Sequence, residues 1–209
     1  MESKQKINNT AYAYVDLGLP SGTLWATMNV GASKPSDYGL YFQWGDTKGY
    51  TKEQVGIDEG QKAFAWADYK FSINGSNENF SKYTTPGAKL EFEDDAANAN
   101  MGGDWHMPTP EQFKELLDNT TSERIEQDGV EGMTFTSKKD SSKSIFIPAS
   151  GSAWAGDTHI SGVYGYVFSN MLSNSEVRSG QYFCFTPKEA NIYSGDGRCI
   201  GLPVRGVIG

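Results

Sequence analysis

The sequence predicts an α+β fold with a mostly antiparallel sheet, two helices and long loops. Aromatic residues and glycines are abundant, with 11 Tyr, 11 Phe, 5 Trp and 24 Gly among 209 residues. Strand-like segments lie towards both ends of the chain, and two helix-like segments lie together in the middle. Such segregation is typical of the α+β class. We expect residues 1–11 to be a polar N-terminal segment and residues 12–209 to form a single domain.

The start of the domain predicts two strands around a turn. Tyr12 and Tyr14 lead into the first strand, which Pro20-Ser21-Gly22 ends because these residues favour turns. Residues 24–29 alternate with the period of a strand. Residues 38–47, YGLYFQWGDT, predict a short aromatic strand that ends at Gly45-Asp46.

Residues 46–90 have no clear period, and we interpret them as a long loop region with at most short elements. Lys, Gly, Asn, Ser and Thr predominate between scattered aromatic residues. We expect these aromatic side chains to anchor the loops rather than to contact a ligand: Phe64, Trp66, Tyr69, Phe71 and Tyr83.

A short helix is predicted in residues 92–103, FEDDAANANMGG. Asp94 and Asp95 stand where acidic residues favour a helix N-terminus, and alanines follow them. Gly102 suits the C-terminal cap.

A second helix is predicted to begin after Thr109, a good N-cap residue. Pro110 takes the first helical position, and Gln112 is placed to complete a capping box. The apolar residues Phe113, Leu116 and Leu117 then fall on one face of this helix.

The rest of the chain predicts strands separated by polar loops. GMTFTS (132–137) and SIFIPASG (144–151) are the first two, and Pro148 ends the second. The last third is rich in Gly, Ser, Asn and Tyr, and three segments in it predict further strands: YGYVFSN (164–170), GQYFCF (180–185) and IGLPVRGV (200–207). No internal repeat is visible.

The net charge of −8 argues against nucleic acid as a partner, because an acidic protein repels phosphates. No apolar segment approaches the roughly 18 residues that a membrane span requires, so we predict no insertion into a membrane. The N-terminus, MESKQKINNT, is polar and shows no secretion signal. We predict no cofactor.

The sequence contains no arrangement that predicts catalysis, and we expect a protein that is not an enzyme. A Ser–His–Asp triad needs a histidine beside a nucleophile, and no GxSxG motif lies near His106 or His159. We interpret His106 as a structural residue beside Trp105. His159 is expected in a solvated loop.

The two cysteines and the densest acidic cluster also favour structural roles. Cys184 and Cys199 belong to no CxxC pair, which argues against zinc, and both a disulfide and two buried thiols remain open. The acidic residues of 91–95 could bind calcium through oxygen ligands. We favour acids of a helix N-terminus and a solvated face, and we predict no metal site.

The last third of the chain carries the predicted ligand-binding residues. Tyrosine offers large contact area at low entropic cost, and small polar residues add adaptable hydrogen bonds. The alternative is that these are ordinary polar loops around core tyrosines. The predicted binding residues are Trp154, Tyr164, Tyr166, Asn170, Asn174, Glu176, Arg178, Tyr193, Asp196 and Arg198.

Three ordered blocks resemble the Fibrobacter major paralogous domain family, which is common in surface proteins of gut Bacteroidetes. They are residues 14–47, residues 90–117 and SIFIPASG (144–151), and the resemblance runs from about residue 12 to 207. It implies a C-type-lectin-like fold in which ligands meet loops and strands near the C-terminus. The chain departs from the family's usual pattern at His106, usually arginine, at 167–169, usually Trp-Ser-Ser, and in LPVRGV (202–207).

The resemblance implies non-catalytic recognition of an extracellular protein or glycan, with adhesion at the cell surface as the leading form. The first alternative is a variable receptor-binding protein of a phage or a diversity-generating retroelement, which would carry no signal. The second is an oxidase similar to formylglycine-generating enzymes, for which the cysteine spacing is unsuitable. The calcium motifs of lectins, Glu-Pro-Asn and Trp-Asn-Asp, are missing.

Overall fold

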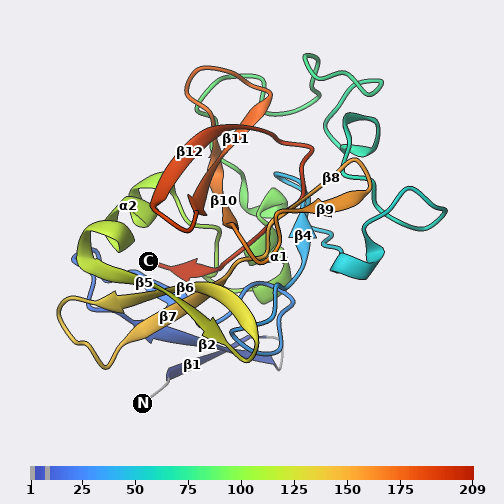
Figure 1. Ribbon diagram of the computed structural model, residues 1–209. Helices are drawn as coiled ribbons and strands as arrows, with labels where there is room; N and C mark the ends of the chain where they lie inside the picture. The colour runs from blue at the N-terminus through green and yellow to red at the C-terminus, as the bar shows by residue number, and fades with distance from the viewer. Residues whose placement is uncertain (1–2, 8–9) are drawn as a thin grey trace.

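The structure is a computed structural model that describes residues 3–7 and 10–209, with side chains over 12–195 and 197–209. It confirms the α+β class: antiparallel sheets form most of the regular structure, and two helices lie in the middle of the chain (Figure 1). The β structure is divided among several small sheets. Within the described residues, no helix combines the length and the apolar character needed to cross a bilayer.

The two ends of the chain meet in one sheet, whose strand order is β1-β2-β3-β14. These strands are Ser3–Ile7, Thr10–Asp16, Leu24–Ala26 and Val207–Ile208. β14 runs antiparallel to β3, so the last residues close onto the start of the domain. A second connection between the two halves pairs β4 (Tyr41–Phe42) with β13 (Leu202–Pro203).

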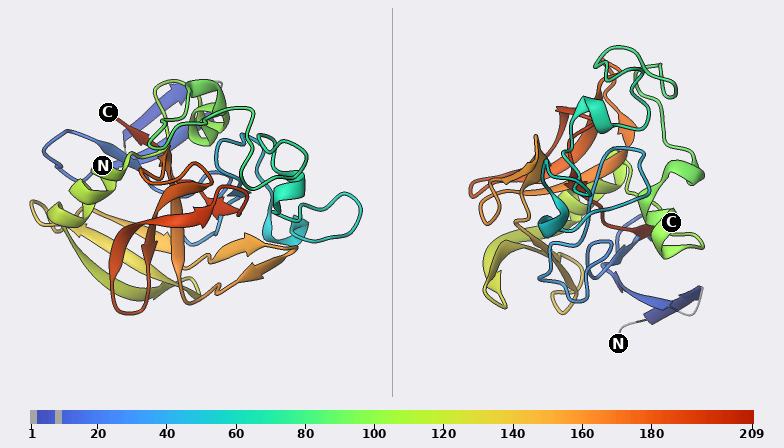
Figure 2. Two further views of the ribbon diagram at one scale, coloured as in Figure 1. Left: turned by 90° about the horizontal axis from the view of Figure 1, so that it is seen from above. Right: turned by 90° about the vertical axis from the view of Figure 1, so that its right-hand side faces the viewer.

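Two three-stranded antiparallel sheets lie on either side of α2 (Pro110–Asn119). One contains β5 (Thr120–Gln127), β6 (Val130–Ser137) and β7 (Ser144–Pro148). The other contains β10 (Gly165–Leu172), β11 (Ser179–Phe185) and β12 (Ala190–Gly197). The hairpin of β8 (Ser152–Trp154) and β9 (Asp157–His159) lies beside the long loop, at the side of the molecule away from α2 (Figure 2).

One of the two main hydrophobic clusters forms around α2 because its apolar face points between these two sheets. Phe113 stacks on Phe183 of β11 with ring centroids 5.1 Å apart, and Trp25 approaches it from β3 at 5.4 Å. Phe113 and Leu116 are fully buried and Leu117 partly so, which confirms the predicted face.

Both helices begin as their sequences predict. At α2, the Gln112 amide donates to Thr109 Oγ1 (3.2 Å) and the Thr109 amide donates to Gln112 Oε1 (3.0 Å), which completes the capping box. At α1 (Ala96–Met101), Asp95 caps the helix by accepting from the Asn98 amide at 2.9 Å. Gly102 ends α1 with a φ of 74°, a conformation that favours glycine.

Arg205 ties the two halves of the fold together from a fully buried position. Its guanidinium donates to Asn29 Oδ1 (2.9 Å), the Ala26 carbonyl (2.9 Å) and the Phe146 carbonyl (3.0 Å). Burial lowers the pKa of this guanidinium, and the three acceptors offset the cost of burying the charge.

The long loop region contains only short 3₁₀ helices, as predicted: η1 (Lys52–Gln54) and η2 (Trp66–Asp68), with η3 (Phe92–Asp94) just after it. Most of its aromatic residues are anchors. Phe64, Tyr69 and Phe71 are buried, and edge-to-face contacts link Tyr69 to Phe71.

The sequence analysis missed five strands: β1, β5, β8, β9 and β12. β5 reads TTSERIEQ and β12 reads ANIYSGDG, so neither contains the alternation that marks a strand. Both lie at the edge of a sheet, where only one neighbour is bonded and polar side chains remain in water. The segment that we expected to be merely polar, 1–11, supplies β1, which pairs with β2.

Candidate functional site

A pocket of about 360 Å³ opens where four segments meet: the start of β11, the end of β12, the β8–β9 hairpin and the long loop. Its aromatic and charged lining consists of Trp66, Trp154, His159 and Arg178. The other lining residues are small or uncharged: Asn77, Ser152, Ser179, Gly195, Gly197, Cys199 and Ile200. None of these carries a carboxylate. We call this site the Trp154 pocket.

A tight hairpin presents Trp154 and His159 to the pocket. Trp154 pairs with Asp157 across a two-residue turn, Ala155-Gly156, in which φ is positive at both residues (53° and 80°). Such turns match the twist of a β-hairpin. His159 Nε2 lies 3.0 Å from the Trp154 carbonyl oxygen, and the Gly156 amide donates to the Ala63 carbonyl of the long loop at 2.7 Å. The hairpin is thereby fixed, while the Trp154 side chain remains 40% exposed.

Trp66 forms the opposite wall and is held by other aromatic rings. Its ring centroid lies 5.9 Å from that of Tyr69 and 5.7 Å from that of Phe80. Gly197 lets the indole approach the backbone, because a Cβ at this position would lie only 3.0 Å from Trp66 Cζ2. The position of the Trp66 ring is therefore fixed by its packing.

Arg178 is the only cationic residue among the described residues that line the pocket. Its Nε donates to Glu176 Oε2 at 2.8 Å, and Glu176 Oε1 accepts from Ser179 Oγ at 2.5 Å. Bonds from Ser179 and then Arg178 hold the pKa of the Glu176 carboxyl below its usual value. No hydrogen bond to the terminal guanidinium nitrogens is seen within the described residues, so these face outward with their donors available.

A row of tyrosines crosses the β10–β11–β12 sheet, and none of these four residues lines the pocket. The centroid distances are 6.4 Å from Tyr164 to Tyr166, 5.7 Å from Tyr166 to Tyr182 and 6.0 Å from Tyr182 to Tyr193. The strand register places the last three on one face, and the opposite face packs into the core around α2. All four are half-buried. β12 supplies Tyr193 to this tyrosine row and two glycines to the pocket.

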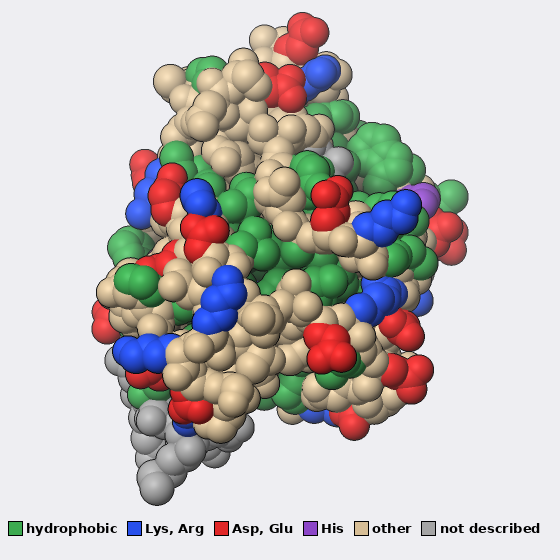
Figure 3. Space-filling view, turned by 60° about the vertical axis from the view of Figure 1, so that its left-hand side comes forward, with side chains coloured by type: hydrophobic (Ala, Val, Ile, Leu, Met, Phe, Trp, Pro, Cys, Tyr) green, Lys and Arg blue, Asp and Glu red, His purple; other side chains and the backbone are tan. Residues whose placement is uncertain are grey.

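The molecular surface carries a recess with aromatic and apolar character. Figure 3 shows one face in which hydrophobic side chains, tyrosine included, gather in a central hollow while acidic and basic side chains surround it. An apolar recess with charged groups around it is typical of ligand-binding surfaces.

Six of the ten predicted binding residues fall into two groups, one at the pocket and one in the tyrosine row. Trp154 and Arg178 line the pocket, Glu176 holds Arg178, and the tyrosine row includes the three predicted tyrosines, Tyr164, Tyr166 and Tyr193. Asn174 is exposed between β10 and β11, outside the pocket lining. The side chain of Asp196 lies outside the described residues.

Arg198 is placed differently from the expected surface residue, because its side chain is fully buried. It donates to the Tyr83 carbonyl at 2.9 Å and to the Lys82 carbonyl at 3.1 Å. The guanidinium carbon lies 3.7 Å from the centroid of the Phe80 ring. Arg198 therefore holds the long loop against the domain and does not reach the surface.

Asn170 is also buried, with only 2% of its surface exposed. Its backbone N–H donates to the Pro108 carbonyl, and its backbone carbonyl accepts from the Leu90 amide. Asn170 thereby joins β10 to the helical region. Its side chain lies at a separate small pocket of about 160 Å³. Its Oδ1 has no hydrogen-bond partner among the described residues.

His106 contacts two backbone carbonyls and no nucleophile. Its Nδ1 lies 2.9 Å from the Met107 oxygen and its Nε2 lies 3.1 Å from the Gly209 oxygen. These contacts hold the end of the chain near the start of α2, and they agree with a structural role beside the fully buried Trp105.

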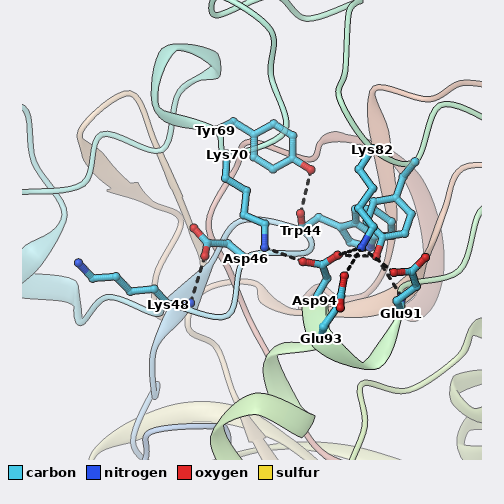
Figure 4. Close-up of polar contacts among 10 residues, drawn as sticks. Trp44, Asp46, Lys48, Tyr69, Lys70, Lys82, Glu91, Glu93 and Asp94 are labelled. Atoms are coloured by element: carbon cyan, nitrogen blue, oxygen red, sulfur yellow. Dashed lines mark hydrogen bonds and ion pairs between the residues drawn. The ribbon is translucent and has the colours of Figure 1, made fainter.

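The acidic cluster surrounds a lysine. Lys82 Nζ lies 2.6 Å from Glu91, 2.8 Å from Glu93 and 2.6 Å from Asp94, and Lys70 Nζ lies 2.7 Å from the other Asp94 oxygen (Figure 4). The three carboxylates offer oxygens within 4.8 Å of one another, which is close enough for a cation. In this arrangement, the Lys82 ammonium takes that position.

Asp95 is separate from this lysine-centred cluster. It accepts from the Met107 amide as well as from the Asn98 amide. Burial raises the pKa of its carboxyl, against the effect of these bonds. Its role is to cap α1 and to hold the segment that leads into α2.

Both cysteines are buried and neither forms a disulfide, which decides between the two alternatives left open by the sequence. Cys184 lies on β11, whereas Cys199 lies in the turn after β12. Burial raises the pKa of the Cys199 thiol to about 12, so this thiol remains protonated near neutral pH.

Of the eleven described lining residues, only Trp154 and Arg178 were predicted, and the nine others include Trp66, Asn77, Ser152 and His159. Trp66 was expected to be only an anchor, and His159 was expected in a loop, although it ends β9. Residues 66 and 77 reach the pocket only because the long loop folds back across the domain. A pattern of adjacent residues contains no signal for such a contact.

Comparison with known proteins produced no match to a protein-family model, a curated protein or a solved structure.

Proposed function

We propose that this protein is a non-catalytic ligand-binding domain that recognises an extracellular protein or glycan through the Trp154 pocket and the tyrosine row. One observation carries the proposal. The pocket combines an exposed indole, a second indole fixed by packing, and an arginine whose outer nitrogens are available. Convergent aromatic and polar groups of this kind bind ligands. Ser152 pairs with His159 across the hairpin, but among the described residues no hydrogen bond joins their side chains, so the contact between nucleophile and base that covalent catalysis needs is not formed.

The C-type-lectin-like fold is part of this proposal. Its support is the resemblance of the three sequence blocks, together with an antiparallel architecture, two central helices and a long loop. The proposed location is extracellular or at the cell surface. For the variable-protein alternative, the support is the tyrosine-rich C-terminal third, and a neighbouring reverse transcriptase gene would favour that alternative.

The oxidase alternative loses support from the cysteines. An oxidase needs a reactive thiolate that a substrate can reach, whereas Cys184 and Cys199 are buried and lie in different segments. Cys199 borders the pocket, but burial keeps its thiol protonated. A binding role accounts for the same pocket without a chemical step.

An array of glycans and proteins tests this function. Trp154→Ala and Tyr193→Ala should each weaken any specific binding by about tenfold, because aromatic contacts dominate such interfaces. Phe92→Ala is the matched control, since Phe92 is 64% exposed but lies outside the pocket. Specific binding that survives both aromatic substitutions, or that falls equally with Phe92→Ala, would contradict the proposed site.

A further inference from the structure

The charge of the Trp154 pocket differs from that of the whole protein. The chain carries a net charge of −8, yet no described lining residue is acidic, and Arg178 is cationic. Glu176, the nearest partner of Arg178, engages only its Nε. Among the described lining residues, the terminal guanidinium nitrogens of Arg178 therefore provide the charged donors that a ligand can contact.

The geometry of Arg178 suits a planar anion. Ser179 Oγ donates to one oxygen of Glu176, and the other oxygen accepts from Arg178 Nε. The guanidinium group of Arg178 is therefore oriented before a ligand binds. The remaining nitrogens form the outer edge of the guanidinium, which matches the two oxygens of a carboxylate. Orientation in advance lowers the entropic cost of binding.

The remaining lining favours a sugar ring over an apolar side chain. Trp154 and Trp66 provide flat aromatic surfaces, and Asn77 and Ser152 provide hydrogen-bonding groups for hydroxyls. Among the described lining residues, Ile200 is the only one with an aliphatic side chain. These residues therefore form no deep apolar subsite. At about 360 Å³, the pocket is near the lower end of the range of small-molecule sites, about 300–1,000 Å³.

We infer that the Trp154 pocket binds a carboxylate-bearing sugar, with its ring against the indoles and its carboxylate on Arg178. This inference rests on the proposed function and specifies its ligand class. It also names Arg178 as the residue that distinguishes an acidic sugar from its neutral counterpart.

Two matched pairs of probes test the ligand class by calorimetric titration: digalacturonic acid against its dimethyl ester, and sialyllactose against its methyl ester. At least one acidic member should bind about tenfold or more tightly than its neutral partner, because one charge-assisted contact is lost in the latter. Raising the salt concentration should reduce this preference through screening. A glutamate-rich peptide is included as the competing ligand class.

Variants then assign the preference to one side chain. Arg178→Gln should lower the affinity for the acid to about that for the neutral partner. The thermal unfolding of this variant, compared with that of the wild type, reports whether it is folded. Lys114→Gln is the charge-matched control, because Lys114 forms a similar exposed pair with Asp118 on α2. Trp154→Ala should weaken both members of the pair.

Equal binding within both pairs, no sugar binding, stronger binding of the peptide, or unchanged acid affinity in Arg178→Gln would overturn the inference. The proposed function has a separate outcome. If the array finds another ligand whose binding requires Trp154, the function stands and only the ligand class is wrong. If no array ligand requires Trp154, the function itself fails.

Discussion

Lys82 shows how one residue affects the ionisation of several neighbouring carboxyl groups. Three carboxylates converge on its ammonium group, and Tyr83 donates to the same oxygen of Asp94 at 2.7 Å. Burial alone would raise the pKa of the Asp94 carboxyl, but bonds from Lys70, Lys82 and Tyr83 together lower it below its usual value. The acidic loop is therefore stable as a set of ion pairs near neutral pH.

At the residue scale, we predict that Asp94→Asn destabilises the protein by about 2 kcal/mol at pH 7, because hydrogen bonds to a charged group are lost. The folded-state pKa of Asp94 is lowered, so its contribution is present above the unfolded value and is lost as pH falls through the folded value. The free-energy difference between wild type and variant, measured by urea denaturation, should therefore shrink from pH 6 towards pH 3.

Asp104→Asn is the control for this prediction. It removes the same charge from an exposed side chain that forms no ion pair within the described residues. We expect it to change stability by less than about 0.5 kcal/mol at pH 7. A difference for Asp94→Asn that stays constant or grows on acidification would show that the ion pairs do not stabilise the loop.

At the scale of elements, α2 connects local and distant structure. Its capping box is formed by neighbours in sequence, whereas Gln112 also donates to Thr23 Oγ1 (3.3 Å) and to the Gly209 carbonyl (2.9 Å). Phe113 and Leu116 fill the space between two sheets. The helix start therefore positions both the C-terminal strand and the sheet that carries the tyrosine row.

We predict that Thr109→Ala lowers the free energy of unfolding by about 1 kcal/mol, the typical effect of losing an N-cap. A double-mutant cycle with Gln112→Ala separates the capping box from the other contacts of Gln112. The effect of the double variant should be smaller than the sum of the single effects by about 0.5 kcal/mol. Strict additivity in urea denaturation would indicate that the two residues act independently.

At the scale of the whole molecule, packing buries charged and sulfur-containing side chains that could otherwise act at the surface. Arg198 and Arg205 are fully buried cations, and each donates to backbone carbonyls that join distant segments. The two thiols are buried in separate places. At these positions positive charge and sulfur thus serve the framework, whereas the Arg178 side chain is exposed.

We predict that both thiols react with a disulfide reagent such as DTNB only after unfolding. In urea the protein should release two equivalents of the chromophore, whereas the native protein should react at least a hundredfold more slowly than an exposed cysteine introduced by Lys114→Cys. Fast reaction of the native wild type, or fewer than two equivalents after unfolding, would contradict two buried thiols that form no disulfide.

Local patterns were sufficient where neighbours in sequence determine the structure. The capping box at Thr109, the acid before α1 and the glycine after it were all predicted, because each acts within one helical turn. The strand at 180–185 was predicted because one face enters the core. β5 and β12 were missed because an edge strand is defined by its partner and not by its own residues.

The sequence by itself determined the α+β class, both helices and the aromatic anchors of the long loop, since each depends on short-range periodicity or on residue type. Only the tertiary structure decided which polar residues reach the surface. It buried Asn170 and Arg198, and it brought Trp66, Trp154 and Arg178 to one pocket from segments far apart in the chain. The physical reason is that burial and pocket formation depend on how distant segments pack, and a linear pattern does not record those contacts.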